Sequence, residues 1–342
     1  MELRLVRTGV ILGSLVALTA TGCATATKAQ MIGTGDPVAD RQRLMKNVGA
    51  NWADIQAKVK AGAPETVAVN AEALSLHAQR IPTLFPAGSL TDKSKAKPDI
   101  WQKWPEFEAA AKNLENRAAT LRDQAAAKDG AAVTATVANF GREACGTCHT
   151  PFRVPPPSSS RPSHGRNVKG GEMKRGRARN AIVLGSLVAL AMVSTATGQS
   201  TAKLWSSDVV ADRQRLMKLN GASWADAQAK LKAGNAEAVA VNAETMALIA
   251  TQIITLFPEG SLTDKSKAKP EIWQKWPEFE AATKNYAMQA EKLRDAARTK
   301  DLVATEAVAK DFGRQACGAC HTPFRVPPPQ QTPAPPAQPP TR

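Results

Sequence analysis

The sequence repeats itself over most of its length. A shift of 172 positions superimposes residues 38–46 on 210–218, and residues 145–149 on 317–321, without a gap. A period this long indicates two copies of one complete domain rather than a solenoid of short repeats. The copies also provide an internal control, because a residue that their shared chemistry requires should occur in both.

The formal net charge of +15 is concentrated outside the two copies. Residues 36–153 carry +3 and residues 205–325 carry +2, whereas the connecting residues 154–204 carry +7. A nucleic-acid-binding protein places a basic patch on a folded domain. Both candidate domains are close to neutral, so we expect no nucleic-acid partner.

Residues 1–26 have the pattern of a secretory signal. Arg4 and Arg7 precede an apolar stretch over 10–18, and small residues follow. Two interpretations stay open: cleavage near Ala26, or a lipid anchor at Cys23, where the sequence resembles a lipoprotein cleavage site. We expect an exported, periplasmic protein that contacts a membrane only through this leader or a lipid anchor.

The connecting residues 154–204 contain a second signal-like pattern. A basic cluster at 173–177 precedes an apolar run over 181–193, which is shorter than the roughly 20 residues that a membrane span needs. One hypothesis is that two reading frames, each encoding an exported domain, have become one chain. The alternative is an interdomain linker. Proline-rich residues before this pattern, and again over 326–342, indicate extended segments.

Apolar residues in each copy recur at intervals of three and four, which is typical of helices in a bundle. The sequence therefore predicts an all-α fold, with two antiparallel four-helix bundles in tandem over 36–153 and 205–325. The longest irregular segment in the first copy is 83–98. The apolar stripes of its first three helices are Met45, Val48, Trp52, Ile55 and Val59; Val67, Ala71, Leu74, Ala78 and Ile81; and Phe107, Ala111, Leu114, Ala118 and Leu121. A fourth helix is predicted from about Ala131 to His149.

The most specific motif is Cys145-x-x-Cys148-His149, which returns as Cys317-x-x-Cys320-His321. Two thiols three residues apart on a helix can form thioethers with one haem, and the adjacent histidine can ligate its iron. Zinc would need a fourth ligand in the cluster. A thioredoxin-like site requires a strand before the helix, and a disulfide would not require the histidine. We therefore predict two covalent haem c groups per chain.

With this motif near the end of a predicted bundle, each copy resembles a class II c-type cytochrome, the cytochrome c' family. The resemblance covers nearly all of 36–153 and 208–325. It includes Arg41-Gln42, Pro98-Asp99-Ile100-Trp101, Phe140-Gly141 and the residues from Cys145 to Arg153. It implies a four-helix bundle whose haem-attachment motif lies close to the C-terminus.

The resemblance also implies roles for residues outside the motif. An arginine at Arg41, or Arg213 in the second copy, would face a haem propionate. One at Arg153, or Arg325, would lie near the proximal histidine. Met45 and Met217 occupy the position from which some family members supply a second iron ligand. The alternative for each is an ordinary surface arginine or a methionine packed in the core.

We therefore expect an exported dihaem carrier of single electrons that serves redox partner proteins and is not an enzyme. If Met45 and Met217 do not bind iron, the resemblance implies a gas-binding protein with five-coordinate iron, which would bind nitric oxide. Family members often dimerise through their first two helices. The two copies are therefore expected either to pair within the chain or to form a homodimer.

Residues that differ between the copies are not expected to share in this chemistry. His77 corresponds to Ile249, so we expect a surface or boundary histidine rather than a ligand. Cys23 corresponds to Thr195. The tryptophans that persist in both copies are expected to pack in the core and around the haem; they are Trp52, Trp101, Trp104, Trp224, Trp273 and Trp276.

Overall fold

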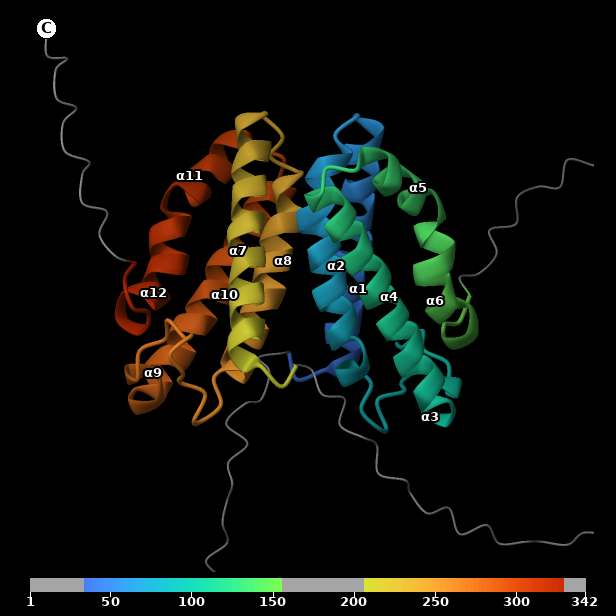
Figure 1. Ribbon diagram of the computed structural model, residues 1–342, viewed down its shortest axis with the longest axis horizontal. Coiled ribbons are helices and arrows are strands. Elements are labelled where there is room, and N and C mark those ends of the chain that lie inside the picture. The colour runs from blue at the N-terminus through green and yellow to red at the C-terminus, as the bar shows by residue number, and fades with distance from the viewer. Residues whose placement is uncertain (1–33, 156–205, 329–342) are drawn as a thin grey trace, which may run out of the picture.

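The computed structural model describes residues 34–155 and 206–328. Within these residues the chain is helical, and β-type pairing is limited to two isolated bridges, Ala96 with Arg153 and Ala268 with Arg325. The helices form two antiparallel four-helix bundles (Figure 1). The predicted fold class is confirmed. The leader, the second signal-like pattern and most of the proline-rich tail lie outside the described residues.

The first bundle begins with α1 (Pro37–Lys60), and local chemistry fixes both ends of this helix. The Asp36 carboxylate accepts a hydrogen bond from the Val38 amide at 2.8 Å, and Pro37 occupies the first turn. The chain leaves the helix at Gly62, whose φ of +78° is a left-handed conformation that glycine adopts without strain. The remaining elements are η1 (Pro64–Val67), α2 (Ala68–Arg80), η2 (Pro82–Leu84), α3 (Asp99–Gln102), α4 (Trp104–Ala126), α5 (Gly130–Phe140), η3 (Gly141–Cys145) and α6 (Gly146–Phe152).

The second bundle repeats this order with small changes at the helix ends. Its first helix is capped by Asp208 in the way that Asp36 caps α1. The second bundle, within the described residues 206–328, has no element equivalent to η1 between its first two helices. Its elements are α7 (Val209–Lys232), α8 (Val239–Ile253), η4 (Ile254–Leu256), α9 (Glu271–Gln274), α10 (Trp276–Arg298), α11 (Leu302–Phe312), η5 (Gly313–Gly318) and α12 (Ala319–Phe324).

The last predicted helix is not a regular α-helix along its whole length. The prediction of a helix from about Ala131 to His149 is confirmed in extent, because residues 130–152 are helical throughout, but α5 and α6 are joined by η3, a turn of π-helix. Gly141 begins this turn and Cys145 ends it. A π-turn widens the helix by one residue and is common next to functional sites. The same turn, η5, precedes α12 in the second bundle.

The two bundles pack against each other through their first two helices. Figure 1 shows α1 and α2 beside α7 and α8 at the centre of the molecule. Leu76 of α2 belongs to the buried apolar cluster of the second bundle, and Leu248 of α8 belongs to that of the first. Each bundle therefore completes the core of the other, and the expected pairing within the chain is observed.

Pairing explains one wrong prediction, which concerns His77. We expected a surface or boundary histidine, but its side chain is fully buried, with 0% exposed. Its Nε2 lies 2.7 Å from the Asn47 Oδ1 atom of α1. The second bundle covers this face of α2, so residues on both sides of the helix are buried. The apolar period within one copy could not indicate this.

Burial lowers the pKa of His77 from 6.5 to about 3, and the charge of Arg80 contributes. The unfolded chain therefore binds a proton that the folded chain excludes between these pH values. This proton makes stability fall by about 1.4 kcal/mol per pH unit as the pH decreases from 6.5 towards 3. In the His77→Ile variant, the free energy of unfolding, measured by chemical denaturation at several pH values, should change less steeply with pH. The difference in slope should be about this amount between pH 6.5 and 3. An unchanged slope would contradict the burial of a neutral imidazole.

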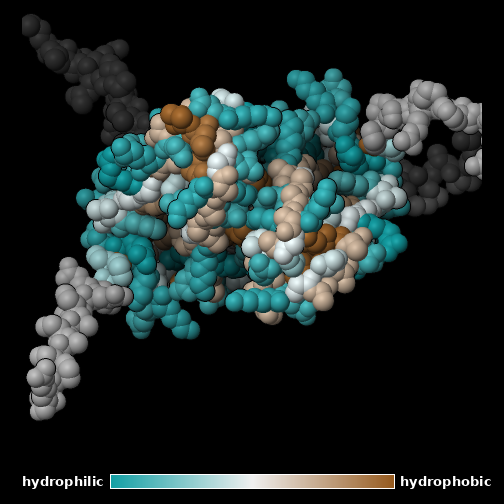
Figure 2. Space-filling view, turned by 90° about the horizontal axis from the view of Figure 1, so that it is seen from above, coloured by the Kyte–Doolittle hydropathy of each residue, from teal (hydrophilic) through white to brown (hydrophobic). Residues whose placement is uncertain are grey.

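The face of the molecule seen from above is mainly hydrophilic. Seen from above, hydrophobic residues form only small separate patches (Figure 2). Among the described residues, one stretch, Val239–Leu256, is long and apolar enough to cross a membrane, with a mean hydropathy of 1.4. It is 83% buried within the protein, as is typical of a core helix.

Candidate haem site

The attachment motif of each bundle lies on a short helix held in place from both ends. In the first bundle, the π-turn η3 ends at Cys145, and α6 carries Cys148 and His149. Both cysteines are half-buried and unpaired, as are Cys317 and Cys320 in the second bundle. The thiols and the imidazole therefore lie within two turns of one helix.

The long irregular segment between α2 and α4 anchors the other end of α6. The amide of Lys97 donates to the Phe152 carbonyl at 2.9 Å, and the amide of Val154 donates to the Lys95 carbonyl at 2.8 Å. The equivalent bonds, from Lys269 and Val326, recur in the second bundle. The segment 83–98, which is predicted to be irregular, thus supports the helix that carries the motif.

The protonation states of the motif argue against a reactive thiol pair and leave the histidine able to bind a metal. Burial raises the pKa of Cys148 to about 11, and the neighbouring Cys145 adds to this effect. A reactive thiol pair requires the opposite shift. Burial lowers the pKa of His149, as does the charge of Arg153, so the imidazole is neutral near pH 7 and its nitrogen is free to bind a metal.

A cavity of about 480 Å³ lies beside the motif of the second bundle. Cys320 and His321 of α12 line it, as do Met217 of α7 and the two arginines Arg213 and Arg325. The remaining wall is mainly apolar and includes Val210, Ile253, Phe257, Ile272, Phe279 and Phe324. Thiol, imidazole, thioether, cationic and apolar groups thus surround one space, and this set of residues fits a haem.

The arginine of the first helix is held in the same way in both bundles. The Arg213 guanidinium lies 4.4 Å from the centre of the Phe257 ring, and its Nη2 donates to the Ser261 carbonyl at 2.7 Å. Arg41 makes the equivalent contacts with Phe85 and Ser89. The Nε atom of Arg213 is buried without a hydrogen-bond partner. A buried cation held by neutral groups favours a negatively charged ligand group nearby.

The methionines of the first helices are half-buried and pack against the two cores. Met217 has an additional neighbour, because the Asn220 Nδ2 atom lies 3.9 Å from its sulfur. The Tyr286 hydroxyl donates to Asn220 Oδ1 at 2.8 Å. The first bundle has Val48 and Leu114 at the positions of Asn220 and Tyr286. The two sites therefore differ beside the methionine, which a residue-by-residue comparison of the copies could have found.

The tryptophans pack against the cores, as the sequence predicts. Trp52 stacks on Phe140 with ring centres 4.8 Å apart, and Trp224 and Phe312 are equivalent. The indole nitrogen of Trp101 donates to the Phe85 carbonyl at 3.1 Å, and so fixes the chain after α2. Trp104, Trp273 and Trp276 also pack against the two apolar clusters.

Comparison with known proteins identifies the fold and the motif together. The family described as Cytochrome C' matches residues 36–153 and 208–325. The chain belongs to the cytochrome c' family. It is therefore a c-type cytochrome with two cytochrome c' regions in tandem, and proteins of this family bind covalent haem c. One solved cytochrome c' is described as having a ligand-controlled dimer dissociation.

Individual cytochromes c' match one region at a time. A cytochrome c' from Pararhodospirillum photometricum is 32% identical over 116 residues, which are 33% of this chain and 92% of the relative. The solved cytochrome c' from Rubrivivax gelatinosus has 25% identity and a TM-score of 0.32, and covers 34% of this chain and 94% of its own. That from Thermochromatium tepidum has 26% identity and a TM-score of 0.33, with 35% and 95% covered.

Proposed function

We propose that the chain is an exported dihaem carrier of single electrons, with one haem in each bundle. The proposed iron ligands are His149 and Met45 in the first bundle, and His321 and Met217 in the second. The observation that carries the proposal is that Met217 and His321 line one cavity although they belong to the first and last helices of their bundle. A group in this cavity can be reached by both side chains.

The residues around the cavity suit a centre that changes its charge by one electron. Haem iron would supply the redox chemistry. The two cysteines would fix the group to η5 and α12, and a neutral histidine beside them would ligate the metal. The apolar wall would keep water away from the group, and Arg213 would compensate the charge of a carboxylate on it. The proposed role is to carry electrons and involves no chemical change of a substrate. The proposed partners are redox proteins in the periplasm.

The spin state of the iron tests this proposal. Iron with histidine and methionine ligands is expected to be low-spin in both bundles of the oxidised protein, as measured by electron paramagnetic resonance. The Met217→Ala variant should convert half of the iron to the high-spin state and leave the other half unchanged. Met288→Ala is a matched control, because Met288 is 59% exposed on α10. High-spin iron in the parent protein would reject the carrier function for that bundle.

One observation favours a second function for the second bundle. The contact of Asn220 with the Met217 sulfur gives this atom a partner within its own helix. If the sulfur keeps that partner, the iron has an open position and the second bundle is a gas-binding site for nitric oxide. The parent spectrum would then show one high-spin and one low-spin iron. In the first bundle Val48 replaces Asn220, so no equivalent amide competes for the Met45 sulfur.

A further inference from the structure

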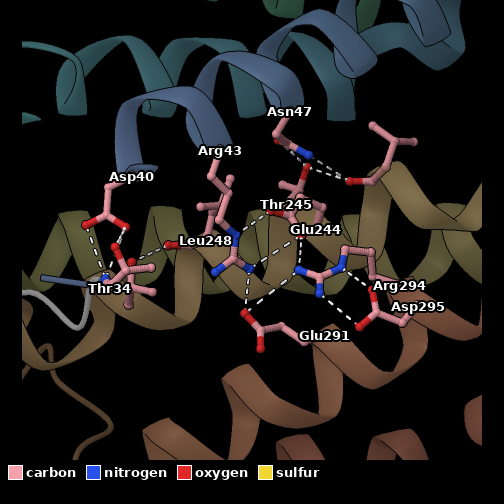
Figure 3. A network of polar contacts seen from close by, with 12 residues as sticks. Thr34, Asp40, Arg43, Asn47, Glu244, Thr245, Leu248, Glu291, Arg294 and Asp295 are labelled. Atoms are coloured by element: carbon pink, nitrogen blue, oxygen red, sulfur yellow. Dashed lines mark hydrogen bonds and ion pairs between the residues drawn. The ribbon is translucent and has the colours of Figure 1, made fainter. Parts of the chain in front are cut away.

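The contacts between the bundles include ion pairs that are the same on both sides of the interface. Arg43 pairs with Glu244 at 2.6 Å, and the equivalent Arg215 pairs with Glu72 at 2.6 Å. Figure 3 shows the first of these pairs with its neighbours Glu291 and Arg294. Both copies contain the arginine and the glutamate, so two first bundles or two second bundles could form the same pairs. These two pairs orient the bundles without distinguishing like from unlike. Arg43 also pairs with Glu291 at 2.6 Å, and this pair occurs on one side only because the counterpart of Glu291 is Ala119.

One turn after these arginines, the two sides of the interface differ. On one side, Asn47 Nδ2 donates to the Val241 carbonyl at 3.3 Å, and Asn47 Oδ1 accepts from the Thr245 hydroxyl at 3.1 Å. On the other side the equivalent residues are Leu219 and Ala73, which belong to one buried apolar cluster. One contact is thus polar with polar, and the other is a large apolar residue with a small one.

Two neighbouring side chains of the first bundle fix the orientation of Asn47. His77 Nε2 lies 2.7 Å from Asn47 Oδ1, and Asn51 Nδ2 lies 2.9 Å from the same oxygen. Asn51 also donates to the Thr245 hydroxyl at 3.1 Å. The second bundle has Ile249 and Ser223 at the positions of His77 and Asn51. The difference therefore extends over a group of residues.

We propose that this interface is selective for unlike bundles, so that each bundle binds the other in preference to a second copy of itself. Two first bundles would place Asn47 opposite Ala73, where the buried amide oxygen loses the hydroxyl. Two second bundles would place Leu219 opposite Thr245, where the larger side chain overfills the space and meets a polar group. Only the unlike pair matches both contacts in size and polarity.

The first test asks whether pairing survives without the connecting chain. A protease site is introduced between residues 156 and 205 of the full protein, and the protein is cut. The halves are expected to remain together in native mass spectrometry. Cut protein labelled with heavy isotopes is then mixed with unlabelled cut protein until subunits exchange. Unlike pairs should dominate the mixture; like pairs at comparable abundance, or separated halves, would overturn the proposal.

In the second test, residues on one side of the interface are replaced by the residues at the equivalent positions on the other side. The double variant Asn47→Leu with His77→Ile gives the first bundle the residues of the second, opposite an unchanged Thr245. In cut protein the dissociation constant should rise about tenfold or more. Adding Thr245→Ala reproduces the native contact of Leu219 with Ala73 and should restore most of the affinity. Circular dichroism checks that each variant keeps its helices. Equal affinity of the double and triple variants would overturn the proposal.

Discussion

Replacement of Cys317 and Cys320 by alanine is expected to leave one covalently bound haem per chain instead of two. Cys320 lines the cavity of the second bundle, and Cys317 lies three residues before it in the preceding π-turn. Without these thiols no bond can hold the group when the protein is denatured. The mass of the denatured protein measures the number of attached groups directly. Without the haem, the apolar residues that line the cavity would also lose the group against which they pack. We therefore expect the second bundle to unfold at a lower temperature.

Two controls make this result specific. Replacement of Cys145 and Cys148 should remove the other haem, and replacement of all four cysteines should give a colourless protein. Cys23→Ser should leave both haems attached, because Cys23 has no counterpart in the second copy. Two haems in the Cys317→Ala, Cys320→Ala variant would refute the assignment of the motif.

Neutralising two aspartates at the centre of the interface is expected to destabilise the protein strongly. Lys58 and Lys230 each contact both Asp54 and Asp226, at distances of 2.7 to 3.2 Å. These four side chains are only 11% to 17% exposed. In the Asp54→Asn, Asp226→Asn variant, two half-buried ammonium groups face each other without a counter-charge. We expect a loss of about 3–5 kcal/mol in the free energy of unfolding, measured with urea.

The same group of charges predicts a dependence on pH. Burial by itself raises the pKa of Asp226, but the charges and hydrogen bonds of Lys230 and Lys58 outweigh it and hold the pKa below 3.8. Its contribution to stability is therefore present above pH 3.8 and is lost as the pH falls through the lower value in the folded protein. The double variant should lack this acid-sensitive part.

An exposed ion pair serves as the control for both measurements. Lys112 pairs with Glu115 at 2.8 Å on α4, and the lysine side chain is 61% exposed. Lys112→Ala should change the free energy of unfolding by no more than about 0.5 kcal/mol. A loss at Asp54 and Asp226 no larger than this would show that the buried charges do not stabilise the pairing.

The helices and the attachment motif could be predicted from the sequence because local rules determine them. Leu74, Ala78 and Leu121 follow the helical period and are fully buried, and Gly62 ends the first helix as its backbone conformation requires. The spacing of Cys145, Cys148 and His149 identified the chemistry of the site. Matching positions in the two copies also indicated that Met45 and Met217 belong together.

The interface could not be predicted because most of its residues are polar, so the helical spacing of Asn47, Asn51 and Asp54 is that expected of a helix face exposed to water. Ser75, His77 and Arg80 are polar and occur on a helix whose apolar stripe is already complete, so they suggest an exposed surface. They are buried on a helix that also packs against α7, where Arg215 donates to the Ser75 hydroxyl at 3.0 Å. The π-turns were equally hidden, since Gly141 to Cys145 fit a regular helix by composition. Both features depend on contacts between residues distant in the sequence.

The position of the two motif helices has a consequence for how the molecule meets others. α6 and α12 lie at opposite outer edges of the paired bundles, with the four pairing helices between them (Figure 1). A protein docked over one edge leaves the opposite edge uncovered. Two partner proteins docked over the two edges would therefore not exclude each other.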